Sequence, residues 1–302
     1  MTDTSRRDTL KCWGMGAGTL FTLSGGVFSA FDMAQAAPAE MGTPLFLQIS
    51  DTHIGFNKEA NPDVIGTLNK TIDAVNALPK QPALVLHTGD VTQLSKPSEF
   101  DTANQLLSRL KVSELHVVPG EHDVTDGPGA EFFARFGKAS NNRGHYSFDS
   151  QGVHFIALVN VMNFKANGLG ALGEDQLAWL KDDLSGRSAS QPIVVFAHMP
   201  LWTIYEPWGW GTGEGEQIAA LLRRFGSVTV LNGHIHQVVQ KVEGNILFHT
   251  ARSTAFPQPQ AGDGPGPGPL VVPPAQLPGM LGVTMAVAGR KHRLSLNDTT
   301  LA

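Results

Sequence analysis

The sequence has only one cysteine, Cys12, among its 302 residues. A disulfide within the chain is therefore excluded, and a thiolate is excluded from any metal site built by the remaining residues. Exported proteins commonly carry disulfides, whereas a protein that folds in the cytoplasm before export does not need them. Stability must come from an apolar core, which a chain of this length can form.

The sequence also lacks a block of Lys or Arg residues, and its formal net charge is −5. A nucleic-acid duplex or an anionic membrane surface attracts proteins through clustered positive charge. We therefore expect neither as a main partner. A small-molecule substrate suits this composition better.

Residues 1–36 have the features of an export signal. A pair of arginines at 6–7 precedes a weakly apolar run that ends in Ala-Gln-Ala. The S-R-R-x-x-L-K pattern at 5–11 resembles a twin-arginine signal, which directs the export of folded proteins. We expect contact with the twin-arginine export machinery, cleavage near Ala36 or Ala39, a periplasmic or extracellular location, and no stable membrane insertion after processing. The alternative is a transmembrane anchor, which the glycines of the apolar run disfavour.

The rest of the chain, residues 43–302, has the pattern of a single α/β domain. Short apolar runs bounded by turn residues predict buried strands near 45–49, 83–87, 115–118, 153–159, 193–197 and 228–231. Between them, apolar residues at helical spacing predict helices near 64–75, 97–110, 173–184 and 215–225.

The C-terminal part predicts hairpins rather than further strand-helix units. Strands near 238–242, 246–248, 282–287 and 292–296 have no helices between them, which favours a sandwich over a simple doubly wound sheet. The segment 257–278 contains eight prolines and the run GDGPGPGP. Such a composition neither pairs as a strand nor coils as a helix, so we expect a long surface loop.

Acidic residues and histidines follow five of the predicted strands. The motifs are QISDTH, HTGD, PGEHD, FAH and NGHIH, which place candidate metal ligands at Asp51, His53, Asp90, Glu121, His198, His234 and His236, with a further histidine at His122. Because the C-terminal ends of strands in an α/β sheet face one crevice, these side chains can meet in one cluster. Imidazole and carboxylate without thiolate select ions such as Zn, Mn, Fe or Ni rather than Mg or Ca alone.

This set of motifs, in this order, resembles the calcineurin-like metallophosphoesterase superfamily over about residues 45–237. The segments QISDTH and HTGDVTQ look most like its cyclic-nucleotide phosphodiesterase branch. The resemblance implies a four-layer αββα sandwich with two divalent or mixed-valence metal ions, Fe, Mn or Zn, at the C-terminal strand ends. Asp90 would bridge the ions, one of which would take Asp51, His53 and His236. The other would take residue 121, His198 and His234.

The implied reaction is hydrolysis of a phosphoester by a metal-bridging hydroxide. His122 would protonate the leaving oxygen, and its alternative role is that of a residue that starts a helix. The family pattern has asparagine where this chain has Glu121. Three carboxylates against two divalent ions leave a charge of +1, so we expect tight metal binding and a preference for singly charged phosphodiesters over monoesters. The alternative is that Glu121 swings away and leaves a weak second site.

Other candidates lie outside these motifs. Trp202, Tyr205, Trp208 and Trp210 could stack against a flat substrate group or pack under a long loop. Arg252, beside His249, could clamp a phosphate or lie on the surface. His87, His116 and His154 lie within strand runs, and we expect them to be structural.

The sequence thus predicts an exported two-metal phosphodiesterase. A competing hypothesis is a protein that binds metal or a phosphorylated ligand with weak or lost catalysis because of Glu121. His122 argues against it, since a binding protein needs no general acid. A third hypothesis, a metallohydrolase for bonds other than phosphoesters, predicts amide or ester cleavage.

Overall fold

The structure is a computed structural model, which describes residues 44–141, 143–288 and 294–302. The predicted export signal at 1–36 lies outside the described residues, as does the start of the predicted strand at 292–296. Within the described ranges, none of the helices is long and apolar enough to cross a membrane.

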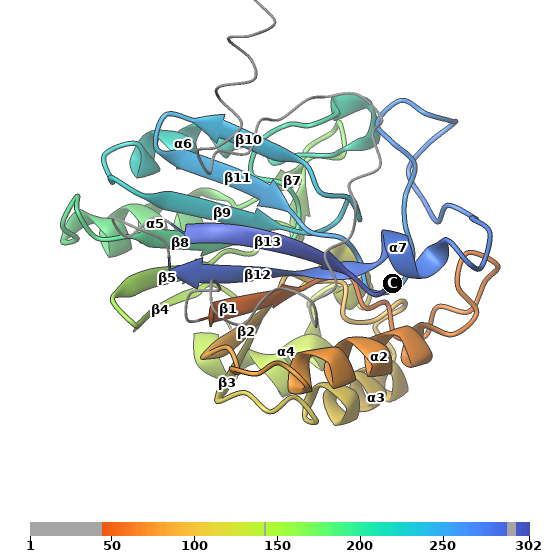
Figure 1. Ribbon diagram of the computed structural model, residues 1–302. Helices are drawn as coiled ribbons and strands as arrows, with labels where there is room; N and C mark the ends of the chain where they lie inside the picture. Colours follow the sequence, from red (N-terminus) through yellow and green to blue (C-terminus); the bar gives the residue numbers. More distant parts are fainter. Residues whose placement is uncertain (1–43, 142, 289–293) are drawn as a thin grey trace, which may run out of the picture.

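Two mixed β-sheets stack at the centre of the molecule (Figure 1). The first sheet has the order β13-β12-β1-β2-β3, with parallel pairing among the last three strands. Its strands are β1 (Pro44–Ile49), β2 (Leu84–His87), β3 (Glu114–Val117), β12 (Gly282–Ala288) and β13 (Leu294–Thr300).

The second sheet has the order β10-β11-β9-β8-β5-β4, and its inner pairs β11-β9, β9-β8 and β8-β5 are parallel. Its strands are β4 (Tyr146–Ser150), β5 (Val153–Ala157), β8 (Ile193–Phe196), β9 (Val228–Asn232), β10 (Gln240–Glu243) and β11 (Ile246–Thr250). A small separate ribbon consists of β6 (Asn163–Phe164) and β7 (Gly170–Ala171).

Helices cover the outer face of each sheet. The first sheet packs against α2 (Val64–Asn76), α3 (Pro97–Leu107) and α4 (Ala130–Phe136), and the second against α5 (Glu174–Ser185) and α6 (Gly215–Leu222). The short helices are η1 (Glu121–Asp123), η2 (Gly137–Ser140), η3 (Glu206–Trp208) and α7 (Leu277–Met280). The predicted four-layer αββα sandwich is therefore confirmed.

Local sequence explains where these helices begin and which face they bury. In α2 the side chain of Asp63 accepts a hydrogen bond from the backbone N–H of Gly66 at 2.8 Å, which satisfies a free donor at the helix start. Pro97 occupies the first turn of α3, where its missing N–H costs nothing. The predicted apolar stripe of α2 is buried, and its members are Val64, Leu68, Ile72 and Val75.

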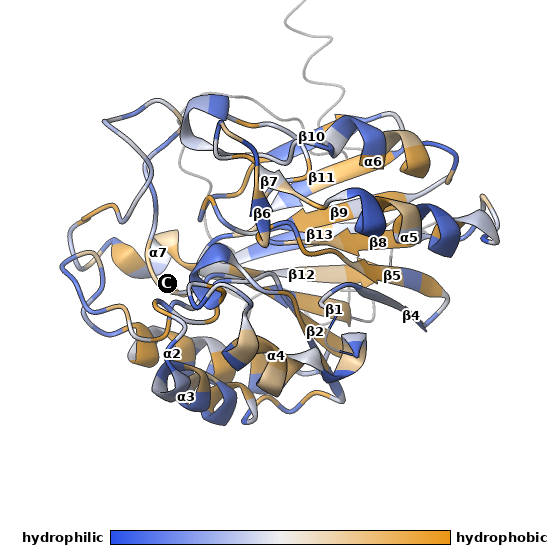
Figure 2. Cartoon of the chain, turned by 180° about the vertical axis from the view of Figure 1, so that it is seen from behind, coloured by the Kyte–Doolittle hydropathy of each residue, from blue (hydrophilic) through white to orange (hydrophobic). Residues whose placement is uncertain are grey.

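Apolar side chains fill the space between the two sheets. Phe46 of the first sheet meets Phe155 of the second edge to face, with ring centroids 5.7 Å apart, and Phe148 stacks on Phe155 at 4.9 Å. In Figure 2 hydrophobic residues concentrate on the central strands, while hydrophilic ones gather on helices and loops. This layer fixes the two sheets against each other, and so fixes the relative positions of their strand ends.

The predicted loop at 257–278 contains no regular element before α7, which begins at Leu277. It projects at one edge of the molecule, beside α7 (Figure 1).

Candidate metal centre

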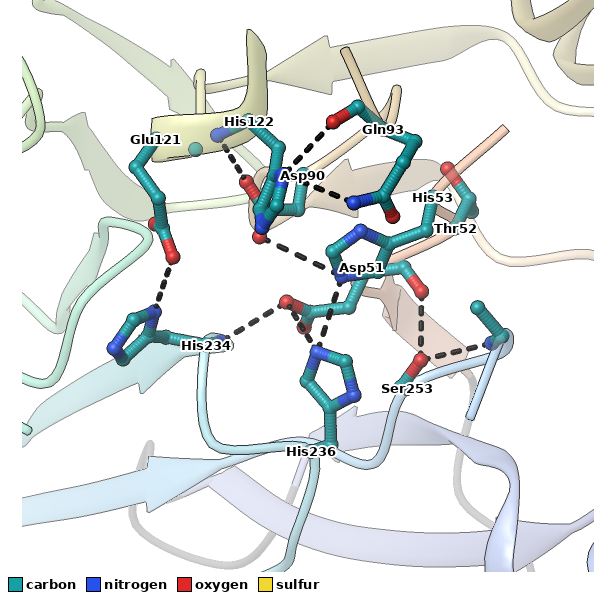
Figure 3. Close-up of polar contacts among 12 residues, drawn as sticks. Asp51, Thr52, His53, Asp90, Gln93, Glu121, His122, His234, His236 and Ser253 are labelled. Carbon is teal, nitrogen blue, oxygen red and sulfur yellow. Dashed lines mark hydrogen bonds and ion pairs between the residues drawn. The ribbon is translucent and has the colours of Figure 1, made fainter. Parts of the chain in front are cut away.

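Five loops carry the predicted ligands to one place between the two sheets. The loops after β1, β2 and β3 come from the first sheet, and those after β8 and β9 come from the second. In each case the ligands follow the C-terminal end of a strand that is parallel to its neighbour. Figure 3 shows the side chains from both sheets pointing toward a common centre. The packing of the sheets thus brings together residues that are far apart in the sequence.

The backbone of this centre is unusual. Asp51, His53, Asp90, His234 and His236 all have positive φ, between 42° and 68°. Residues other than glycine rarely adopt this left-handed conformation, which costs on the order of 1–3 kcal/mol each. Such strain persists where the position of a side chain matters more than local stability, so five cases in one cluster indicate a functional site.

Two glycines allow the ligand loops to approach each other. A Cβ atom on Gly120 would lie 2.0 Å from Oδ1 of Asp90, and one on Gly233 would lie 2.1 Å from Oγ of Ser50. Any side chain at either position would therefore push the loops apart. This explains the glycines that stand directly before Glu121 and His234.

The first group of potential ligand atoms comes from Asp51, His53 and His236, all buried. Oδ1 of Asp51 lies 3.3 Å from Nε2 of His236, and Nε2 of His53 lies 3.2 Å from that same nitrogen. This is the set of residues that the resemblance implies for one metal ion.

The second group comes from Glu121, His198 and His234. The two carboxylate oxygens of Glu121 face different rings, because Oε2 lies 2.8 Å from Nε2 of His198 and Oε1 lies 2.9 Å from Nδ1 of His234. Glu121 therefore points into the centre and does not swing away from it.

Asp90 lies between the two groups. Its Oδ2 atom is 3.5 Å from Nε2 of His53 in the first group and 3.4 Å from Nε2 of His198 in the second. A single carboxylate oxygen thus faces a ligand atom of each group, which suits a ligand that bridges two ions through one oxygen. The backbone N–H of His122 donates to the other oxygen of Asp90 at 3.0 Å, which holds the carboxylate in this orientation.

Buried polar atoms without hydrogen-bond partners show that these residues fit metal ions. They include Oε2 of Glu121, Nε2 of His198 and Nδ1 of His234. Although these atoms lie close together, the contacts lack the angles of a hydrogen bond. Atoms that share an ion between them have this arrangement, and burying them without a partner would otherwise be costly.

The charge states also suit metal ligands, which must be deprotonated. Burial alone would raise the pKa of Glu121, but the rings of His234 and His198 hold it well below its usual value. Burial lowers the pKa of His53 to about 3, so this ring is neutral. Burial would also lower the pKa of His198, but Asp90 and Glu121 raise it well above the usual value. Because the charges of Asp90 and Glu121 cause this rise, a cation bound between them would lower the pKa of His198 again and favour its deprotonated form.

Comparison with known proteins places this centre in a family. The family model of calcineurin-like phosphoesterases matches residues 44–238, which is more than half of the chain. The chain belongs to this family. The predicted superfamily is therefore confirmed, whereas the cyclic-nucleotide branch stays a prediction.

Curated relatives of this phosphoesterase include two phosphodiesterases. A probable glycerophosphodiester phosphodiesterase of Arcobacter nitrofigilis is 28% identical over 69% of this chain and 78% of its own length. A glycerophosphodiester phosphodiesterase of Enterobacter lignolyticus is 26% identical over 64% of this chain and 71% of its own length.

A solved structure shows the same fold. A dimetal phosphatase from Danio rerio superposes with a TM-score of 0.64 at 15% identity, covering 86% of this chain and 97% of that one.

Residues behind the ligands of the phosphoesterase hold the histidine rings in place. Nδ1 of His198 donates to the carbonyl oxygen of Thr88 at 2.7 Å, and Nδ1 of His236 donates to that of Phe256 at 2.6 Å. Each bond leaves Nε2 of the ring free to bind a metal ion. The ring of Phe256 also packs against His53 and His236, with both centroid distances 4.7 Å.

Two further side chains tie the loop after β11 to the metal loops. The hydroxyl of Ser253 donates to the carbonyl oxygen of Asp51 at 2.7 Å, and Nε2 of Gln258 donates to that of His234 at 2.8 Å. No pattern in the sequence indicates these roles, because the contacts join segments with no common motif.

Asp123 joins two of the loops that carry the candidate ligands. Its carboxylate is fully buried and accepts hydrogen bonds from the backbone N–H groups of Val91, Thr92 and Gly120, at 2.8 to 3.0 Å. It thereby joins the loop that carries Asp90 to the loop that carries Glu121. Burial and the charge of Asp90 raise the pKa of Asp123 to about 7, although these hydrogen bonds by themselves would lower it.

The aromatic cluster at 202–210 divides into two parts. Trp202 packs against Phe248, with ring centroids 5.2 Å apart, and Trp210 is fully buried. Tyr205 and Trp208 are partly exposed and meet edge to face, with centroids 5.4 Å apart. The packing role suits the first pair, while substrate contact by the second pair stays a prediction.

Arg252 lies beside Gly282 of β12 and near Asp298 of β13. Its Cδ lies 3.3 Å from the place of a Cβ on Gly282, and its charge contributes to lowering the pKa of Asp298 after the larger effect of His249. Its role as a phosphate clamp stays a prediction. The rings of His87 and His154 are buried, as expected of structural residues, and His116 stacks on Phe148 at 3.8 Å.

Proposed function

We propose that this calcineurin-like phosphoesterase hydrolyses phosphodiesters with two metal ions. One observation carries the proposal: each of two groups of potential ligand atoms has a ring nitrogen within 3.5 Å of the same oxygen of Asp90. Such a pair of ions supplies an activated nucleophile and compensates the charge of the phosphoryl group. Iron, manganese and zinc all suit this set of imidazole and carboxylate ligands.

The position of His122 supports hydrolysis rather than binding alone. Its ring lies edge-on to His53, with centroids 5.0 Å apart, at the side of the centre formed by the first sheet. Nδ1 faces the carbonyl oxygen of Gln93 at 2.8 Å, so Nε2 is free to give a proton to the leaving oxygen. Burial would lower the pKa of His122, but Asp90 and Glu121 raise it above its usual value.

Substrates with one negative charge fit this centre better than those with two. Asp51, Asp90 and Glu121 carry three negative charges, so two divalent ions leave a net charge of +1. The reduced positive charge weakens the attraction of the centre for a phosphodiester monoanion less than its attraction for a monoester dianion. The two glycerophosphodiester phosphodiesterases among the relatives support diesters as the substrate class, and glycerophosphodiesters are the first group to test.

The test is hydrolysis of bis(p-nitrophenyl) phosphate, p-nitrophenyl phosphate and a glycerophosphodiester by protein of measured metal content. We expect diester hydrolysis to exceed monoester hydrolysis, and the Glu121→Asn variant to gain relative activity on the monoester. A wild-type protein that prefers the monoester would overturn the substrate class. Two bound ions without turnover on any ester would favour the competing role of a metal-retaining binding protein.

We also propose export through the twin-arginine pathway to the periplasm or the outside of the cell. The pattern at 5–11 supports this, together with the single cysteine of the chain. The full-length protein, expressed in a bacterium, should appear in the periplasmic fraction, and a variant with both Arg6 and Arg7 changed to Lys should stay in the cytoplasm. Equal distribution of the two proteins would refute this route.

A further inference from the structure

We propose that Glu121 makes the two metal positions of this centre chemically equivalent, so that both hold an ion of the same kind before substrate arrives. The inference rests on the proposed function, because it concerns the same pair of ions. It goes beyond that function by specifying how the resting protein is loaded.

The donor groups of the two positions match in kind and number. The first position has one carboxylate of its own from Asp51 and two imidazoles from His53 and His236. The second has one carboxylate of its own from Glu121 and two imidazoles from His198 and His234. Asp90 faces both. Each ion would therefore meet two carboxylates, one of them shared, and two imidazoles.

The geometry of Glu121 supports its role as a ligand. Each of its oxygens lies within 2.9 Å of a ring nitrogen of the same group. Neither contact has the geometry of a hydrogen bond, so Oε2 of Glu121 and both ring nitrogens have no hydrogen-bond partner. Its side chain is 28% exposed, against 0% for Asp51. The second position is thus equal to the first in donors but lies closer to solvent.

No Lys or Arg side chain pairs with this set of acids in the part of the chain that the structure describes. The ion pairs of Asp51, Asp90 and Glu121 are all with histidines, and none is with Lys or Arg. Three carboxylates this close together repel one another unless cations lie between them. A neutral amide at position 121 would relieve part of this repulsion but would leave the second position with only the shared carboxylate.

The test measures metal content and release, and needs no activity. Apoprotein is loaded with Mn²⁺ or with Zn²⁺, passed through a desalting column and analysed for ions per chain, and the loaded protein is then challenged with a chelator. Glu121→Gln and Asp51→Asn each remove one carboxylate charge from one position. Glu216→Gln makes the same chemical change on the surface of α6, where the side chain is 77% exposed.

We expect wild type and Glu216→Gln to keep two ions per chain, released at similar rates. Glu121→Gln and Asp51→Asn should each hold one ion as firmly as the wild type does. The other ion should be released faster than from the wild type by on the order of 100-fold, the upper end of the loss in metal affinity when a group that supports a metal site is removed. Circular dichroism establishes that each variant is folded, and Glu121→Asn replaces Glu121→Gln if the latter is not.

Two results would overturn the inference. If Glu121→Gln keeps both ions with wild-type release rates, the carboxylate of Glu121 does not make the two positions equivalent. If wild type releases one ion far faster than the other, the two positions are not equivalent. Either result is compatible with diester hydrolysis by the wild type, whereas two firmly held ions without any hydrolysis would defeat the proposed function and leave this inference standing.

Discussion

Nδ1 of His122 lies 2.8 Å from the backbone carbonyl oxygen of Gln93. Because a carbonyl only accepts hydrogen bonds, Nδ1 must carry the hydrogen, and Nε2 is the atom available to a substrate. The same loop places Nε2 of the Gln93 side chain 3.3 Å from the ring. The loop after β2 therefore carries Asp90, the proposed bridging carboxylate, and also orients the proposed general acid.

Replacing His122 should affect substrates according to their leaving groups. We expect His122→Gln to slow hydrolysis of a glycerophosphodiester about 10²–10⁴-fold, because its alkoxide must be protonated as it leaves. Hydrolysis of bis(p-nitrophenyl) phosphate should fall much less, since p-nitrophenolate leaves without a proton. Steady-state kcat/KM for the two substrates measures the difference. An equal loss on both would show that His122 is not the acid.

Removing the carboxylate of Asp123 should destabilise the protein. In Asp123→Ala the backbone N–H groups of Val91, Thr92 and Gly120 lose their acceptor. Each unsatisfied buried donor costs about 1–3 kcal/mol, so the free energy of unfolding should fall by roughly 3 kcal/mol or more. Urea denaturation of the metal-free protein measures this. The exposed Asp175→Ala is the control, and a change as small as in that variant would refute the role of Asp123 as a link between loops.

Truncating Phe256 should loosen one metal position more than the other. Its ring packs against His53 and His236 of the first position and against Phe56, with a centroid distance of 4.2 Å for the last pair. We expect Phe256→Ala to cost about 3–5 kcal/mol of stability and to speed the chelator-driven release of one ion only. Phe164→Ala is the control, because Phe164 is 51% exposed. Equal acceleration for both ions would contradict the selective contact.

The contact between His249 and Asp298 should give a measurable pH dependence. Burial would raise the pKa of Asp298, but hydrogen bonds from His249 and Thr284 hold it below its usual value of 3.8. A carboxyl group with a lowered pKa stabilises the folded state above its unfolded pKa, and this stabilisation is lost as the pH falls through the folded pKa.

The Asp298→Asn variant tests this effect. It should lower the free energy of unfolding by about 1.5–3 kcal/mol near neutral pH, as for hydrogen bonds to a charged group. The difference from wild type should shrink below about pH 4, where the carboxylate of the wild type begins to take up a proton. Urea denaturation at several pH values measures it. A difference that does not change with pH would mean that the charge of Asp298 contributes nothing.

The sequence predicted the parts of the fold that depend on local patterns. Apolar runs between turn residues identified six central strands, and helical spacing identified α2, with its buried Leu68 and Ile72. The strand β4 was not predicted, because Tyr146–Ser150 is short, mixed in polarity and only partly buried. It forms through pairing with β5, which a local pattern does not show.

The candidate site was predictable only where its residues stand at strand ends. Asp51, Asp90 and His198 were found because a strand and a turn mark each position. The supporting residues Phe256 and Gln258 were not, since they reach the centre from a loop in which nothing in the sequence distinguishes them. Their roles depend on contacts between segments that only the packing of the two sheets brings together.

The central claim is that Asp90 joins two metal ions in one centre. Electron paramagnetic resonance of the Mn²⁺-loaded protein tests it most directly, because two Mn²⁺ ions that share a ligand are magnetically coupled, while separate ions give independent signals. We predict a coupled spectrum for wild-type protein with two ions per chain, and its loss in Asp90→Asn. A wild-type protein that binds two Mn²⁺ ions and shows only the spectrum of isolated ions would contradict the account.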